Sequence, residues 1–132
     1  MLKPQQNNHR DKISLDGIWQ FKIDPENIGI QNNWHLGLSS YKQIAVPSSW
    51  NEIDSELSDY IGVGWYQSEF YISRLWEQKN IYIRFASVTY HCTLWINGQL
   101  VGTHDGGHLP FEFNVSEFLQ KDDANKIVVR VE

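Results

Sequence analysis

Apolar side chains recur at every second position along several short segments of this 132-residue chain. In residues 90–97 they are Tyr90, Cys92, Leu94 and Ile96, which alternate with His91, Thr93, Trp95 and Asn97. A period of two places each set on one face of a β-strand. Alternation or a short apolar run predicts further strands at residues 18–23, 43–46, 65–72, 80–86, 111–115 and 126–132.

A tight turn follows residues 90–96 at Asn97-Gly98. Both residue types tolerate the positive φ that a type I′ turn requires, and turns of this type connect the strands of hairpins. The chain is therefore expected to reverse there and to pair Leu100-Val101 with Trp95-Ile96. With this returning strand, the pattern predicts seven or eight short strands.

Polar side chains gather in the segment that follows the hairpin, His104-Asp105-Gly106-Gly107-His108-Leu109-Pro110-Phe111-Glu112. Two adjacent glycines allow backbone conformations that are closed to other residues, and Pro110 removes a hydrogen-bond donor. The segment is therefore predicted to form an irregular corner, from which Phe111, Phe113 and Val115 alternate inward. Polar groups on a constrained loop are typical of functional sites.

The remaining segments are predicted to be loops and ends. Residues 1–12 are polar and are expected to form a flexible amino-terminal arm. Residues 24–43 contain several structure breakers and predict a long loop, with room for a helical turn, anchored by Trp34. Ser116 is expected to cap a short helical turn that continues to Leu119. Because no segment predicts a helix long enough to connect parallel strands, the sequence favours an all-β, two-sheet antiparallel sandwich over residues 13–132.

Composition and charge exclude several classes of partner. The chain carries 11 basic and 16 acidic residues, for a net charge of −5. No cluster of Lys or Arg is present that would neutralise phosphates, so nucleic acid is not expected as a partner. The chain shows neither a secretion signal nor a run of about 18 apolar residues, so we expect a cytoplasmic location and no membrane partner. Cys92 is the single cysteine and is expected to pack in the core without a disulfide.

Two sets of side chains in the corner suggest chemistry. Asp105 and Glu112 are a carboxyl pair of the kind that glycosidases use, but two glycines and a proline separate them, and nothing in the sequence places them about 5 Å apart. His104, Asp105 and His108 have the chemistry of zinc ligands. However, Gly106-Gly107 argues against the helix that would bring both histidines to one face. We therefore expect no catalytic, cofactor-binding or metal-binding residue, and we expect these side chains to satisfy backbone groups or to contact a neighbouring domain.

The string WINGQLVGTHDGGHLPFEFNVSEFL resembles the Trp-x-Asn-Gly and His-x-Gly-Gly-x-x-Pro-Phe-Glu segments of the amino-terminal domain of glycoside hydrolase family 2, especially its β-glucuronidase branch. Four further strings follow the family's order: Ser14-Leu15-Asp16-Gly17-Ile18-Trp19, Val46-Pro47-Ser48-Ser49-Trp50-Asn51, Gly64-Trp65-Tyr66-Gln67 and Ile83-Arg84-Phe85. The resemblance covers the chain from about Ile13 onward. Many β-galactosidases have Pro-His-Asp-Trp where this chain has Val-Pro-Ser-Ser-Trp-Asn, which favours the glucuronidase branch.

This resemblance implies a jelly-roll sandwich of the galactose-binding-like type. It implies that both catalytic glutamates lie in a β/α barrel of a longer enzyme, with no cofactor. The implied partners are that barrel, an immunoglobulin-like domain, the carbohydrate substrate and further copies of the parent enzyme in a homo-oligomer. The candidates for a domain contact or for the rim of the active site are His104, Asp105, His108, Glu112, Asn51 and Trp65.

The chain also departs from the family's pattern of sugar contacts. Family members reach the active site with an Asp on a loop downstream of the position of Glu132. Members of the β-galactosidase branch use an Asn near the position where this chain has Ile61-Gly62-Val63. Tryptophans offer flat faces to sugars, but Trp50, Trp65 and Trp95 belong to the family strings, which favours packing. The role of Trp76 stays open.

Three functions are compatible with these patterns. The leading hypothesis is the non-catalytic amino-terminal sandwich of a family 2 β-glycosidase, of β-glucuronidase or β-galactosidase type, that braces the barrel and shapes the mouth of its active site. The second is an independent carbohydrate-binding module. The third is a scaffold domain for oligomer assembly. Because the last predicted strand runs to Glu132 without a stop signal, we expect the chain to belong to a longer protein.

Overall fold

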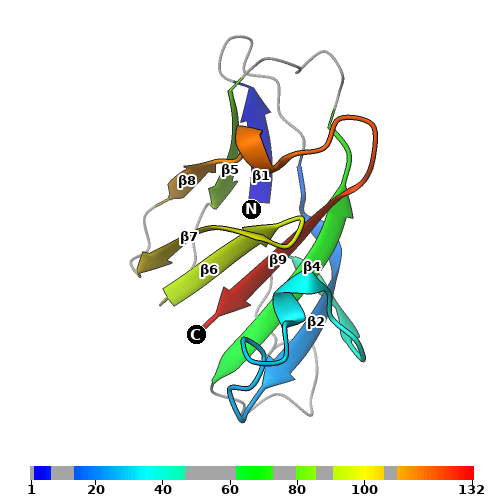
Figure 1. The fold of residues 1–132 in the computed structure, drawn as a ribbon, viewed down its shortest axis with the longest axis vertical. Coiled ribbons are helices and arrows are strands. Elements are labelled where there is room, and N and C mark those ends of the chain that lie inside the picture. Colours follow the sequence, from blue (N-terminus) through cyan, green and yellow to red (C-terminus); the bar gives the residue numbers. More distant parts are fainter. Residues whose placement is uncertain (1, 7–13, 47–61, 73–79, 86–90, 106–109) are drawn as a thin grey trace.

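Two antiparallel sheets facing each other form the body of the protein in a computed structural model (Figure 1). The structure describes residues 2–6, 14–46, 62–72, 80–85, 91–105 and 110–132. Within these residues the strands are β1 (Leu2–Gln6), β2 (Gly17–Asp24), β3 (Lys42–Val46), β4 (Val63–Phe70), β5 (Ile81–Phe85), β6 (His91–Ile96), β7 (Gln99–Asp105), β8 (Phe111–Asn114) and β9 (Asn125–Val131). The predicted all-β, two-sheet antiparallel sandwich is confirmed.

The two sheets differ in size over the described residues. The smaller sheet has the order β1-β5-β8, and the larger has the order β3-β2-β4-β9-β6-β7. Two short 3-10 helices, η1 (Trp34–Leu36) and η4 (Ser116–Phe118), lie in the connections. No helix in this part of the chain is long and apolar enough to span a membrane.

The core lies between the two sheets and follows the predicted alternation. Cys92, Leu94 and Ile96 of β6 point inward beside Ile127 and Val129 of β9. The other buried members of this cluster come mainly from strands of both sheets: Trp19, Phe21, Ile44, Phe70, Ile72, Ile81, Ile83, Phe85 and Val115. When the two sheets pack, the apolar side chains on both inner faces are removed from water. This burial stabilises the packing of one sheet on the other.

Residues 2–6 correct the expectation of a flexible arm over residues 1–12. They form β1 at the edge of the smaller sheet and pair with β5, with Leu2 opposite Phe85 and Gln6 opposite Ile81. Pro4 has no backbone N–H to donate, and an edge strand is the place in a sheet where this loss is tolerated. The polar composition of this segment hid the strand, because β1 shows no alternation that would identify it. Residues 7–12 lie outside the described residues.

The predicted hairpin turn at Asn97-Gly98 is confirmed. The φ values are 52° at Asn97 and 80° at Gly98, as a type I′ turn needs. Trp95 faces Leu100, but Leu94 faces Gly102, so one extra residue forms a bulge in β7. The Asn97 amide also donates to the Phe118 carbonyl at 2.8 Å, while its oxygen accepts the Lys126 N–H at 2.9 Å. The turn is thereby bonded to η4 and to β9.

The expected cap at Ser116 is wrong. The residue before η4 is Val115, and its first turn has no side-chain cap. The Ser116 hydroxyl instead accepts the Ile81 N–H at 2.8 Å and donates to Asn114 Oδ1 at 2.8 Å. The Ser116 hydroxyl therefore bonds Ile81, which becomes adjacent to it only in the folded sheet, and it does not cap η4.

Candidate functional site

His104 and Asp105 lie on a strand, which corrects the prediction that they belong to an irregular corner. Strand β7 continues to Asp105, with His104 opposite Cys92 and Asp105 opposite His91. The strand is longer than expected because β6 offers pairing partners along its whole length. The glycines and His108 of the predicted corner lie outside the described residues, and so does Asn51.

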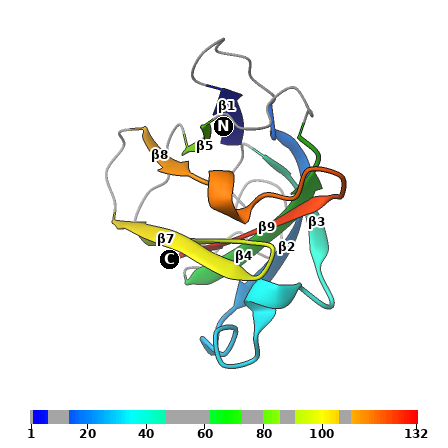
Figure 2. The same cartoon turned by 45° about the horizontal axis from the view of Figure 1, so that its top comes forward.

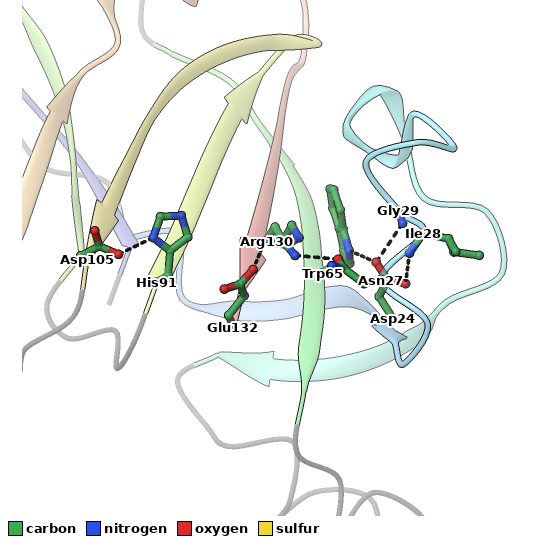
Figure 3. A network of polar contacts seen from close by, with 9 residues as sticks. All are labelled: Asp24, Asn27, Ile28, Gly29, Trp65, His91, Asp105, Arg130 and Glu132. Atoms are coloured by element: carbon green, nitrogen blue, oxygen red, sulfur yellow. Dashed lines mark hydrogen bonds and ion pairs between the residues drawn. The ribbon is translucent and has the colours of Figure 1, made fainter.

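Two contacts fix the side chains at this end of β7. The His104 ring stacks on Phe111 of β8, with ring centroids 3.7 Å apart. His91 Nδ1 and Asp105 Oδ1 lie 2.5 Å apart (Figure 3). The Asp105 side chain is 91% exposed, so solvent screens this pair and it adds little stability. The His104 stack connects the two sheets, whereas the carboxyl group of Asp105 faces solvent.

Asp105 and Glu112, the carboxyl pair considered for catalysis, lie in different sheets. Asp105 belongs to β7 of the larger sheet, and Glu112 belongs to β8 of the smaller sheet, opposite Arg84. Both residues are exposed. No group of three or more His, Cys, Asp or Glu side chains among the described residues is arranged to hold a metal ion. Asp105 and Glu112 therefore offer exposed hydrogen-bonding groups for a contact, but they do not share an enclosed site.

Trp65 is part of a buried aromatic stack and not of a rim. Its side chain is fully buried, and its ring lies 5.3 Å from that of Trp95 at an angle of 16°. Trp34 meets its edge at 5.7 Å, and His35 stacks on Trp95 at 5.7 Å. The loop that carries Trp34 and His35 thus covers the outer face of the larger sheet, as the predicted anchor role of Trp34 requires. Trp50 and Trp76 lie outside the described residues.

Asp24 anchors this covering loop, and the sequence did not single it out. The carboxylate is buried at the end of β2, where it accepts the N–H groups of Ile28 at 2.8 Å and Gly29 at 2.9 Å. It also accepts the indole N–H of Trp65 at 3.1 Å (Figure 3). A buried carboxylate is tolerated when several donors surround it. The one local signal is an Asp that ends a strand and precedes a Pro, which is typical of a turn.

Arg130 extends this polar network across the sheet. It lies on β9 opposite both Trp65 and Thr93. Its guanidinium donates to Asn27 Oδ1 at 2.7 Å and contacts Glu132 Oε1 at 2.5 Å. The group is buried, and its Nε has no hydrogen-bond partner among the described residues. The Asn27 contact ties the covering loop to the last strand, while Glu132 brings a carboxylate to the same end as His91 and Asp105 (Figure 3).

The Cys92 thiol is unsuited to nucleophilic chemistry. It lies in the core between the sheets. Burial raises the pKa of this thiol to about 11. At neutral pH the group is therefore protonated, and the thiolate that would act as a nucleophile is rare. The prediction of a small core side chain is confirmed.

An open groove lies at the opposite end of the larger sheet, beside the β6–β7 turn. Its volume is about 580 Å³. Its lining includes Leu36 of η1, Glu69 of β4, Tyr71, Gly98 of the turn, Asp123 and Lys126 of β9. Local pattern carries no signal for this groove, because its lining comes from four separate segments of the chain: residue 36 and residues 69–71, 97–98 and 120–126.

The sequence profile described as "Glycosyl hydrolases family 2, sugar binding domain" matches residues 13–132. This chain belongs to that family. The family 2 domain is 35% identical to a β-glucuronidase of Paenibacillus borealis over 99% of its own length and 22% of the relative. It is 36% identical to the β-glucuronidase of Mus musculus over 91% of its length and 20% of the relative.

Solved structures agree with this family assignment. The β-glucuronidase of Ruminococcus gnavus superposes with a TM-score of 0.90 at 39% identity, over 98% of the family 2 domain and 22% of that chain. Another β-glucuronidase structure from the same organism, in complex with D-glucuronic acid, has a TM-score of 0.85 at 34% identity. The expected placement in the β-glucuronidase branch and the galactose-binding-like jelly roll are confirmed. The domain spans about a fifth of the length of the relatives that it matches.

Proposed function

We propose that this chain is the non-catalytic amino-terminal domain of a longer β-glycosidase that hydrolyses O-glycosidic bonds of the β-glucuronide type. One observation carries the proposal. Nearly the whole chain corresponds to a single contiguous share of β-glucuronidases, 22% of the Ruminococcus gnavus enzyme, with a TM-score of 0.90. Its role would be to brace the catalytic barrel of the same polypeptide and to shape the mouth of the active site.

The geometry of the carboxyl groups supports a non-catalytic role. Retaining glycosidases place two carboxyl groups about 5 Å apart across the scissile bond, one protonated and one ionised. In this chain Asp105 and Glu112 lie in different sheets and face solvent. The buried carboxylate of Asp24 already accepts three hydrogen bonds from its own loop and from Trp65. None of these three groups is arranged to attack or to protonate a glycoside.

The end of the sandwich near Glu132 supports a bracing role. His91, Asp105 and Glu132 bring charged or polar groups together there (Figure 3). The His104–Phe111 stack lies at the end of β7. Groups of this kind form the polar rim of domain interfaces. We propose that an immunoglobulin-like domain and the β/α barrel of the parent are the partners that contact this end.

A comparison of two proteins tests the proposed function. One is this 132-residue chain, and the other is the longer product of the same reading frame. Both are assayed with an aryl β-glucuronide and an aryl β-galactoside. We expect the chain to be inactive and the longer protein to hydrolyse the glucuronide faster than the galactoside.

Two outcomes would contradict the proposal. Turnover by the clean chain that disappears in Glu112→Ala would show that the sandwich is itself catalytic. A reading frame that supplies no further domain would remove the bracing role. In that case an independent carbohydrate-binding module would become the better hypothesis.

A further inference from the structure

We propose that the groove beside the β6–β7 turn binds a neutral saccharide. It lies between this turn, η1 and the loop that leads into β9, at the end of the larger sheet away from Glu132. Figure 2 shows the yellow turn beside the cyan segment that contains η1. This site needs no catalytic activity of the parent, so it stands or falls independently of the proposed glycosidase.

An exposed aromatic ring provides the apolar contact that sugars require. The Tyr71 side chain is 68% exposed and lies directly after β4. Leu36, which is 57% exposed, supplies a second apolar surface in the lining. The C–H faces of a pyranose pack on an aromatic ring of this kind. By contrast, Trp65 and Trp95 are buried against each other and offer no free face.

Carboxylates and an ammonium group supply the polar contacts. Glu69 lies opposite Lys126 on the neighbouring strand, and both line the groove with Asp123. Lys126 Nζ donates to the Leu36 carbonyl at 3.1 Å, which leaves further N–H groups for a ligand because an ammonium has three. Asp123 accepts the Ala124 N–H through Oδ1 at 2.8 Å, and a carboxylate has a second oxygen that is also an acceptor. Sugar hydroxyls can donate to such carboxylates and accept from the ammonium group.

The charge of the groove favours a neutral ligand over an acidic one. Two carboxylates, Glu69 and Asp123, face one ammonium group, Lys126. A uronate would add a third negative charge and would be repelled. The groove therefore differs in preference from a glucuronide site, and its lining includes the charged side chains of Glu69, Asp123 and Lys126.

Hydrogen bonds hold the walls in place before any ligand arrives. The Asn97 side chain bonds Phe118, Asn125 and Lys126 around the turn. Lys126 in turn bonds η1 through Leu36. A site that is ordered in advance loses little conformational entropy on binding.

A titration with defined sugars tests this site. Amide proton–nitrogen NMR spectra of the isotope-labelled 132-residue chain are recorded with cellohexaose, xylohexaose or mannohexaose, and with hexagalacturonate as the acidic comparison. We expect at least one neutral sugar to shift the amides of Tyr71, Gly98 and Ala124, and we expect hexagalacturonate to bind more weakly. Tyr71→Ala should weaken binding by about tenfold, as expected for the loss of an aromatic contact. Glu69→Ala should weaken it as well.

Tyr41→Ala is the matched control. Tyr41 is 49% exposed and precedes β3, at the edge of the larger sheet opposite β7, outside the groove. Its loss should leave the affinity unchanged, and thermal melts verify that each variant is folded. The proposal is overturned if no neutral sugar shifts the groove amides, if Tyr71→Ala and Glu69→Ala leave affinity unchanged, or if the acidic sugar binds more tightly. It is also overturned if these amides shift with protein concentration alone, because a second copy of the chain would then cover the groove.

Discussion

The indole N–H of Trp65 donates a 3.1 Å hydrogen bond to the buried carboxylate of Asp24, 41 residues away in the sequence. The same carboxylate holds the N–H groups of Ile28 and Gly29. One side chain therefore fixes the start of the loop that covers the outer face of the larger sheet, and it fixes the tryptophan on which that loop packs. The side chains under this loop therefore form a second hydrophobic core on the outer face of the larger sheet.

Asp24→Asn should destabilise the chain by about 2–4 kcal/mol, because an amide replaces one acceptor oxygen by a donor that faces N–H groups. Urea unfolding followed by tryptophan fluorescence measures the change. Glu26→Gln in the same loop is the matched control, since Glu26 is exposed, and it should leave the midpoint unchanged. Equal stability of Asp24→Asn and the unmodified chain would show that the carboxylate is not an anchor.

Gly29→Ala should cost about 1–3 kcal/mol through overpacking. A Cβ at this position would stand 2.6 Å from Trp65 Cε2, so the loop or the indole must move. The neighbouring Ile30 is exposed, and Ile30→Ala should have little effect. Thermal unfolding of both variants checks the prediction, and a Gly29→Ala melting temperature equal to that of the unmodified chain would contradict it.

Gly98→Val should destabilise the hairpin by about 1–3 kcal/mol, because a β-branched residue adopts positive φ only with strain. Gly98 has a φ of 80°, and a Cβ there would also stand 3.0 Å from Leu36 Cδ2. Gln99→Val introduces the same side chain one residue later, at an exposed position of β7. Urea unfolding should separate the two variants, and equal midpoints would argue against strain at the turn.

Alkaline pH should reduce stability through Tyr66. Burial raises the pKa of its phenol to about 12 from an ordinary value of 10.0. Between these two values the unfolded chain binds fewer protons than the folded chain, so the free energy of unfolding falls as pH rises. The contribution of Tyr66 is complete below about pH 10 and is lost by about pH 12.

Urea unfolding at about pH 9 and about pH 11 measures this loss. Tyr66→Phe should show a smaller loss than the unmodified chain, because it has no phenol to ionise. Tyr71→Phe is the control, since Tyr71 is exposed, and it should keep the full loss. The thiol of Cys92 is common to all three proteins and cancels in the comparison. If the pH dependence of Tyr66→Phe were unchanged, another group would be responsible.

Glu112→Ala should leave this chain folded, because the Glu112 side chain is exposed on β8. In the longer enzyme we expect the same change, and His108→Ala, to lower activity or weaken domain packing by about 1–3 kcal/mol if each removes a polar partner buried at the interface. His108 enters from the sequence alone, since it lies outside the described residues. Glu117→Ala, at another exposed site, is the control. Unchanged activity and melting of the longer enzyme in both test variants would show that the corner is not a docking element.

Local sequence determined a large part of the fold. Alternation placed Cys92, Leu94 and Ile96 on the inner face of β6, and Asn97-Gly98 formed the predicted turn. These signals work from sequence because side-chain alternation and turn conformation depend on neighbouring residues. The motif strings also identified the family, which the profile match over residues 13–132 confirms.

Only the tertiary structure decided which polar residues became buried or paired. Local pattern marks neither Asp24 nor Arg130 for burial, yet both are buried, with partners on distant segments. It treated residues 2–6 as an arm and His104-Asp105 as part of a corner, whereas β5 and β6 provide partners that make both into strands. The groove at Tyr71 likewise exists only where four segments meet. A hydrogen bond or a groove depends on which distant groups become adjacent on folding, and local pattern carries no information about that adjacency.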